Sequence, residues 1–340
     1  MIALKLRNLL VVLVAIILII ALSLPKILHA AGLHPDYLSD SFELSDKRAL
    51  IIATNHGVLN APGESSGKLT GLFLSELSVP YFRFLESGIN VDIASIKGGN
   101  IPLEPLPYFV KTKEDKVFLS DNKLMSKLSN SISIANINFE AYDIIFLSGG
   151  WGAAYDLGFS DLLGEKIADA YYSEKKPIIG GICHGVLGLI RAKNKEGGLL
   201  IQGRKMTGVT DKQITELGIN LTPQHPETEL RKAGVIFQSE TRFTDIFANL
   251  TVVDDEKRFV TEMQQRKIDY KNDGINKIME VLKVENIDET SYWGFQPNLG
   301  LGIGIKGFNL DYAFTRLGAA DGGYYTHIFS INMKLSKPVK

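Results

Sequence analysis

The sequence predicts an α/β fold of the flavodoxin-like type, a three-layer sandwich in which helices cover both faces of a mostly parallel sheet. Short β-branched runs alternate with helical segments through the middle of the chain, which is the pattern of such folds. The apolar run at 177–182 is typical of a central strand that is buried on both faces. The chain has 340 residues, 45% of them hydrophobic, so it can bury a core of this size.

The first predicted elements follow a polar linker at 34–47. Residues 48–53 are predicted as the first strand, and a loop rich in Gly, Ser and Pro leads to a helix at 70–87. A second strand is expected at 90–95. The segment 97–139 is an insertion with little strand character.

The second half of this domain brings a glycine-rich turn close to a cysteine. A strand at 143–147 runs into Ser148-Gly-Gly-Trp-Gly152, and a helix is expected at 161–172. The central strand ends at Cys183, where a helical pattern resumes. Later elements complete a domain at 48–285, namely a helix at 226–233, strands at 235–238 and 250–253, a turn at 254–257 and a helix to about residue 282.

The C-terminal residues 292–340 differ from the rest of the chain. Three short strands with glycine-rich or alternating patterns are expected from Leu299, Leu310 and Tyr324. They are similar to the last strands of an outer-membrane β-barrel, but three strands cannot close a barrel and lipid admits no open sheet edge. An appended soluble β-meander therefore fits better than a fused gene fragment or a working piece of membrane barrel.

Residues 1–33 predict a membrane or export signal. A nearly all-aliphatic run from Leu9 to Leu24, preceded by Lys5 and Arg7, covers 16 positions. That length lies between a signal-peptide core and a bilayer-spanning helix. The best cleavage motif, His29-Ala-Ala31, has His where a small residue is needed, which favours an uncleaved single-pass anchor over an exported protein. The basic flank then places the N terminus in the cytoplasm and the globular domain outside.

Charge and cysteine content exclude several functions. Lys and Arg total 37 against 38 Asp and Glu, for a net charge of −1, so the chain lacks the electrostatic footprint of a nucleic-acid partner. The single cysteine, Cys183, excludes an intramolecular disulfide and a cysteine-cluster metal site. If Cys183 has a role, it acts as a thiol.

Cys183 occupies the strongest chemical motif of the chain. In the run PIIGGICHG at 177–185, a strand is followed by G-x-C-x-G and a helical segment, which is the pattern of a nucleophile elbow. Gly181 and Gly185 leave room for a sharp turn, and the start of a helix favours the thiolate. His184 is a candidate base beside the sulfur. We therefore predict a functional thiol rather than a small buried hydrophobe.

These motifs resemble the DJ-1/PfpI superfamily, within the class I glutamine-amidotransferase-like fold. The likeness is strongest to the branch of heat-shock chaperones and glutathione-independent glyoxalases, and it covers about residues 47–261. Cys183-His-Gly185, the glycine-rich run at 148–152 and KLTGLFLSE at 68–76 carry it. In that family a helical glutamate lies against the cysteine, and Glu76 matches that position.

The resemblance implies a stress-protection enzyme, glyoxalase III-like or deglycase-like, that acts on a small-molecule aldehyde without a metal or organic cofactor. Cys183 would add to the aldehyde carbon of a 2-oxoaldehyde such as methylglyoxal, and Glu76 would move the proton between carbon and oxygen. Water would then release lactate from the thioester. The backbone N–H groups of Gly150 and His184 are the expected oxyanion donors. The expected pocket walls are Asn55, His56 and Trp151.

Two departures from the family pattern affect these implications. The acidic residue that usually pairs with the histidine falls on Ile214 here, so Asp211 or Glu216 would have to take that role. The loop after Thr261, which in the family helps to close the pocket or a homodimer, has a different sequence here. Whether the protein forms a homodimer is therefore not decided by the sequence.

A second motif, His225-Pro-Glu227, matches the H-P-E that completes the Cys-His-Glu triad of class I glutamine amidotransferases, and Glu227 is a third candidate partner. Only 42 positions separate Cys183 from His225, about half the usual interval, so we expect this motif to be structural. Two alternatives to the aldehyde enzyme stay open. One is a holdase chaperone or redox sensor without turnover, and the other is an amidotransferase-like domain.

Overall fold

The computed structural model divides the chain into two compact units, Met1–Glu285 and Asn286–Lys340. Positions 34–41 of the predicted linker and Ala31 of the expected cleavage motif lie outside the residues that it describes, as do parts of the predicted tail. The described residues are 2–30, 42–219, 221–241, 245, 248–263, 274–285, 299–305, 308–317 and 324–333.

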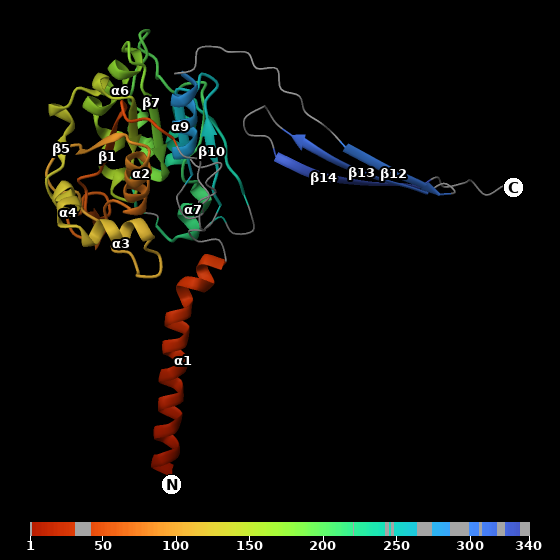
Figure 1. Cartoon of the computed structure of the whole chain (residues 1–340). Helices are drawn as coiled ribbons and strands as arrows, with labels where there is room; N and C mark the ends of the chain where they lie inside the picture. Colours follow the sequence, from red (N-terminus) through yellow and green to blue (C-terminus); the bar gives the residue numbers. More distant parts are fainter. Residues whose placement is uncertain are drawn as a thin grey trace. The chain divides into compact units, whose positions relative to one another are not determined.

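A seven-stranded sheet forms the centre of the first unit (Figure 1). Its strand order is β10-β11-β7-β6-β1-β4-β5, and every neighbouring pair is parallel except β10 with β11, so the mostly parallel sheet is confirmed. The strands are β1 (Arg48–Ala53), β4 (Asn90–Ser95), β5 (Ile132–Ser133), β6 (Ile144–Leu147), β7 (Ile178–Ile182), β10 (Thr251–Val253) and β11 (Phe259–Glu262).

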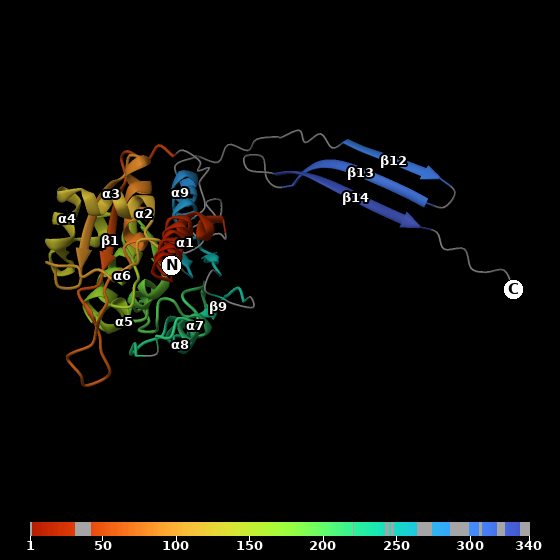
Figure 2. The ribbon, with the colours of Figure 1, turned by 90° about the horizontal axis from the view of Figure 1, so that it is seen from below.

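Helices cover both faces of this sheet, as the alternation of elements predicts. Figure 2 shows α2, α3, α4 and α9 on one side, and α5, α6, α7 and α8 on the other. Alternate side chains of β1 explain the two cores, because Ile51 packs into one apolar cluster and Ile52 into the other. The helices are α2 (Ser75–Glu86), α3 (Lys113–Ser120), α4 (Asn122–Ser129), α5 (Ala153–Asp156), α6 (Asp161–Tyr172), α7 (Asp211–Glu216), α8 (Pro226–Lys232) and α9 (Gly274–Glu285).

Helix α2 begins five residues later than the expected position 70. The segment before it is extended, because the Leu72 N–H donates to the carbonyl of Pro102 over 2.8 Å and Leu72 forms a parallel bridge with Leu103. Gly71, with φ of +148°, begins this segment. The later start places Glu76 in the first turn of α2.

Several short elements were not expected from the sequence. The loop after β1 contains an antiparallel hairpin of β2 (Val58–Leu59) and β3 (Lys68–Leu69), which projects as the orange loop in Figure 2. The helical pattern after Cys183 is a 3-10 helix, η4 (Cys183–Leu189), rather than an α-helix reaching residue 193. The other short elements are η1 (Ile134–Asn136), η2 (Phe139–Ala141), η3 (Leu157–Phe159) and β8 (Lys205–Met206). Strand β8 pairs in parallel with β9 (Ile236–Phe237), which lies within the strand predicted at 235–238.

The N-terminal helix α1 (Ile2–Ala30) matches the predicted apolar segment. Its stretch Leu10–Ile27 has a mean hydropathy of 2.9 and none of it is buried, so by length and composition it could cross a membrane. A signal sequence would have the same properties. The second unit contains the three expected strands as an antiparallel meander, namely β12 (Leu299–Ile305), β13 (Phe308–Leu317) and β14 (Tyr324–Met333).

Candidate active site

Cys183 lies at the carboxyl end of the central strand β7, where η4 begins. Its φ is +54°, a left-handed conformation that is uncommon for a residue with a side chain. The sharp turn predicted from G-x-C-x-G is therefore present. Gly185 is required for it, because a Cβ at that position would lie 2.1 Å from the Leu147 carbonyl oxygen. The turn holds the thiol above the end of the sheet in a strained backbone, as in nucleophile elbows.

The side chains of Glu76 and Cys183 both lie beside Gly149. The Glu76 side chain comes from the first turn of α2 and is 3% exposed. A Cβ at Gly149 would lie 2.4 Å from Glu76 Oε2 and 2.9 Å from Cys183 Cβ. The glutamate and the cysteine therefore approach one another through a gap that only glycine leaves open. This is the arrangement that the family resemblance implies for Glu76.

His184 is fully buried beside the thiol, with Nδ1 3.4 Å from Cys183 Sγ. Its Nε2 has no hydrogen-bond partner among the residues that the structure describes. Burial, with a smaller contribution from nearby His225, lowers the pKa of His184 to about 3. The imidazole is thus neutral near pH 7 and has little tendency to take up a proton.

A small cavity of about 20 Å³ joins these groups, which is enough space for about one water molecule. Trp151 forms part of its wall, 7% exposed and with its ring centroid 4.9 Å from that of His184. This placement agrees with the predicted pocket role of Trp151. The lining residues are Phe73, Glu76, Glu104, Gly150, Trp151, Cys183, His184, Val209 and Leu217.

The two expected oxyanion donors both line this cavity. Gly150 has φ of +99°, and a Cβ there would lie 2.3 Å from the backbone nitrogen of Phe73. Within the described part of the chain, neither Gly150 N–H nor His184 N–H donates to a backbone carbonyl outside its own helix or strand. Both N–H groups can therefore donate to an oxyanion that forms at the cysteine.

Asn55 and His56 have other roles than the expected pocket walls. Neither lines the cavity. The Asn55 side-chain amide donates to the carbonyls of Gly98 and Asn100, and the His56 ring stacks on Tyr155 with centroids 4.1 Å apart. These contacts hold the loop after β1 in place, so the prediction that both residues line the pocket is wrong.

Beside them, Asp156 is a buried carboxyl group that the sequence did not single out. Its Oδ2 accepts a 2.8 Å hydrogen bond from the Asn55 N–H. Burial raises the pKa of Asp156 to about 6, although that hydrogen bond opposes the shift.

The structure brings none of the three proposed acidic partners to His184. Asp211 accepts from the Thr228 hydroxyl over 2.7 Å, and Glu227 accepts from the Asp211 N–H over 3.0 Å. Glu216 accepts from the Asp245 N–H over 2.7 Å. In none of these bonds is His184 the partner.

An apolar cluster occupies the place where the family has its acidic residue. Ile214 is 1% exposed and packs with Trp151 and Val209, and Cys183 contacts the same cluster. His225 caps the start of α8, with its Nδ1 3.8 Å from Asp211 Oδ1. The H-P-E motif thus begins a helix, as expected.

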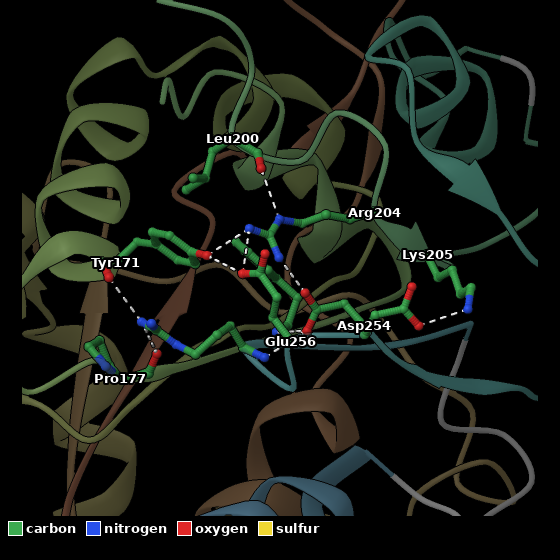
Figure 3. A network of polar contacts seen from close by, with 10 residues as sticks. Tyr171, Pro177, Leu200, Arg204, Lys205, Asp254 and Glu256 are labelled. Carbon is green, nitrogen blue, oxygen red and sulfur yellow. Dashed lines mark hydrogen bonds and ion pairs between the residues drawn. The ribbon is translucent and has the colours of Figure 1, made fainter. Parts of the chain in front are cut away.

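A larger cavity, of about 500 Å³, lies at the opposite, amino end of the strands. Figure 3 shows its centre, where Arg204 donates to the Leu200 carbonyl, to Asp254 and to the Tyr171 hydroxyl. The Tyr171 hydroxyl in turn donates to Glu256 over 2.6 Å. Asp254 also accepts from the Phe259 N–H at the start of β11. This network joins the turn before β11 to the end of α6.

Comparisons with known proteins agree with the geometry at the carboxyl end. The sequence profile of the DJ-1/PfpI family matches residues 70–262. The chain is 31% identical over 159 residues to "Glyoxalase 3" of Candida albicans, covering 46% of this chain and 66% of that protein, just under two thirds of its length. It is 33% identical over 183 residues to a probable glutathione-independent glyoxalase of Saccharomyces cerevisiae, covering 52% of this chain and 74% of the relative.

A solved structure gives the same result for the fold. The X-ray structure of Rapid Encystment Protein 24 KDa from Francisella tularensis superposes with a TM-score of 0.60 at 28% sequence identity. The superposition covers 71% of this chain and 100% of the Francisella chain. The likeness therefore extends over the whole of a protein that lacks counterparts for about a third of the present chain.

Proposed function

Because the chain belongs to the DJ-1/PfpI family, with more than half of its length matched, we propose that it is a glutathione-independent glyoxalase that converts small 2-oxoaldehydes into 2-hydroxy acids. One observation carries the proposal. Cys183 and Glu76 line a single small cavity at the carboxyl end of the sheet, together with Gly150 and His184, the two expected oxyanion donors. Because this cavity holds about one water molecule, even a substrate as small as methylglyoxal requires its walls to move apart.

The reaction begins at the thiol. Glu76 accepts the proton of Cys183, and the sulfur adds to the aldehyde carbon of methylglyoxal. The aldehyde oxygen becomes an oxyanion, which the N–H groups of Gly150 and His184 stabilise before Glu76 returns the proton to it. The product of this step is a hemithioacetal on the cysteine.

The second stage moves hydrogen along the substrate. Glu76 removes the proton from the former aldehyde carbon, and the resulting enediol is reprotonated at the neighbouring carbon. This produces a thioester of lactate on Cys183. Water then hydrolyses the thioester and restores the thiol, so the sum is methylglyoxal plus water giving lactate, without a redox partner.

Lactate release from methylglyoxal by the full-length protein in detergent tests this proposal. We expect Cys183→Ser and Glu76→Gln each to lower kcat/KM by at least about 10³-fold, because each removes a group that acts in the chemical steps. Glu86→Gln is the matched control, since Glu86 ends the same helix with a side chain that is 67% exposed. Lactate formation that survives Cys183→Ser, or its absence from the folded wild-type protein, would exclude this glyoxalase mechanism.

We also propose that α1 anchors the protein in a membrane with the globular unit on the extracytoplasmic side. The exposed apolar stretch Leu10–Ile27 and the basic residues before it support this orientation. Protease added to intact spheroplasts should digest the globular unit. Complete protection in sealed cells, with digestion after lysis, would reverse the proposed orientation.

A further inference from the structure

Glu104 is a second carboxylate at the proposed reaction cavity, and the sequence pattern did not point to it. It belongs to the insertion at 97–139 rather than to the motifs around the cysteine. Its backbone N–H donates to the Leu72 carbonyl over 2.9 Å, and the Leu72 N–H donates back to Pro102. These two bonds hold Glu104 against the segment that leads into α2. This pairing fixes the backbone from which the Glu104 side chain extends.

The side chain of Glu104 places a second carboxyl group beside a small enclosed space. Its Oε2 atom is buried, and the residue lines the same cavity as Glu76 and Cys183. None of the described lining residues is a lysine or an arginine. His184 is neutral there near pH 7. The remaining walls are apolar side chains, so little in the lining would offset the negative charge of a bound anion.

We propose that Glu104 is a specificity-determining residue, which admits uncharged 2-oxoaldehydes and excludes carbonyl compounds that carry a carboxylate or phosphate. A carboxylate accepts hydrogen bonds, so it can bind a hydroxyl group of a hydrated aldehyde or of the hemithioacetal. An anionic substrate would instead lie close to Glu76 and Glu104 in a space that screens charge poorly. This inference rests on the proposed glyoxalase function.

Glyoxylate and methylglyoxal form a suitable pair of probes. Both are small aldehydes with the same number of non-hydrogen atoms, but glyoxylate carries a carboxylate where methylglyoxal carries an acetyl group. Both can add to a thiolate through the aldehyde carbon. A difference in their binding therefore reports charge rather than size.

The test compares wild-type protein with Glu104→Gln, measuring KM for methylglyoxal and the inhibition constant of glyoxylate. We expect the substitution to tighten glyoxylate binding by about tenfold or more, because it removes one of the two carboxyl groups that a bound anion would lie beside. The KM for methylglyoxal should change by less than about threefold. Glu140→Gln, which removes the same charge from an exposed position, should alter neither value. Equal inhibition of the wild type and Glu104→Gln would overturn the proposal.

A second readout separates this inference from the glyoxalase proposal. Alkylation of Cys183 by iodoacetamide, followed by mass spectrometry, reports occupancy of the cavity without turnover. Methylglyoxal should protect the wild-type thiol at a far lower concentration than glyoxylate does. In Glu104→Gln the two protecting concentrations should lie closer together. If the wild type forms no lactate but shows this protection pattern, the glyoxalase function fails and the role of Glu104 stands. Should Glu104→Gln melt early, Glu104→Asp provides the check, because it keeps the charge and must keep the discrimination.

Discussion

The two ends of the sheet carry polar clusters of opposite kinds. At the amino end, Arg204 and its partners surround the larger cavity, and the guanidinium donates to a carbonyl, to Asp254 and to a tyrosine hydroxyl. At the carboxyl end, the smaller cavity is lined by a cysteine in a left-handed backbone and by the fully buried His184. The larger cavity thus lies at one end of the sheet, and the strained cysteine beside a buried histidine lies at the other.

This difference shows how polar residues that support the structure can be distinguished from those that react with a substrate. Buried polar groups that only support the structure are almost always hydrogen-bonded, because an unpaired group lowers stability. Groups that await a substrate are kept unpaired or strained. By this criterion the Arg204 network joins secondary-structure elements, and the strained Cys183 supports the reaction site that we propose at the smaller cavity. The family match, which includes both ends, does not make this distinction by itself.

Among the variants that test this difference between the two ends of the sheet, we expect Gly149→Ala to have the largest effect. The new methyl group would lie 2.4 Å from Glu76 Oε2 and 2.8 Å from the Ile182 carbonyl, so Glu76 must move away from the thiol. We expect methylglyoxal turnover to fall by at least about 100-fold. Gly198→Ala is the amino-end control, since its nearest contacts are atoms of the Asn194 side chain. Comparable losses in both variants would show that the carboxyl end has no special sensitivity.

Asp254→Ala should have the next largest effect, on stability rather than on catalysis. The Asp254 side chain is 1% exposed, and its loss leaves the mostly buried Arg204 without its nearest carboxylate. We expect the free energy of unfolding to fall by about 3 kcal/mol. Asp255→Ala, at a side chain that is 77% exposed, should change it by less than about 0.5 kcal/mol. Urea denaturation measures both. An Asp254→Ala protein that is fully stable but inactive would assign chemistry to the amino end.

A smaller, pH-dependent effect is expected for Asp156→Asn. Its pKa of about 6 in the folded protein lies above the ordinary value of 3.8, so folding favours the protonated carboxyl group. The folded state then binds more protons than the unfolded state between about pH 4 and 6, and Asp156 lowers stability as the pH rises through that window. Asparagine lacks this titration. The free energy of unfolding of the variant, relative to that of the wild type, should therefore rise by up to about 2 kcal/mol between pH 4 and pH 7.

Urea denaturation of both proteins at several pH values measures that difference. Comparison with the wild type is necessary because His184 has the opposite effect. Its folded-state pKa of about 3 lies below 6.5, so its contribution to stability is lost as the pH falls below 6.5. A difference between the Asp156→Asn variant and the wild type that is constant from pH 4 to pH 7 would contradict the raised pKa of Asp156.

Much of the fold follows from the sequence where local pattern and long-range packing agree. The strands β1 and β4 and the helix α6 have the predicted bounds, because their apolar spacing matches the faces that they bury. The start of α2 and the strand β11 depend on distant partners. Leu72 pairs with Leu103 instead of entering the helix, and β11 ends in the buried polar residues Thr261 and Glu262. A local pattern does not contain that information.

The residues of the candidate site likewise divide into those that the sequence predicts and those that it does not. Cys183, Glu76 and Trp151 could be predicted because they lie in motifs that a family shares. Asn55 and His56 follow a strand at the correct end of the sheet, yet the Asn55 amide donates to carbonyls of the loop after β4 and the His56 ring stacks on Tyr155 of α5. Glu104 was missed because its position depends on pairing between two segments that are distant in sequence. Such residues become visible only when the backbone is placed in three dimensions.

The left-handed backbone of Cys183 also has a consequence for the history of the chain. Glycine adopts φ near +54° without steric conflict, whereas a side chain at that angle lowers stability. Selection for stability alone would therefore favour glycine at position 183. Under the mechanism that we propose, mutations at position 183 are filtered by the reactivity of the thiol, so loss of this thiol in a descendant should be followed by drift toward glycine.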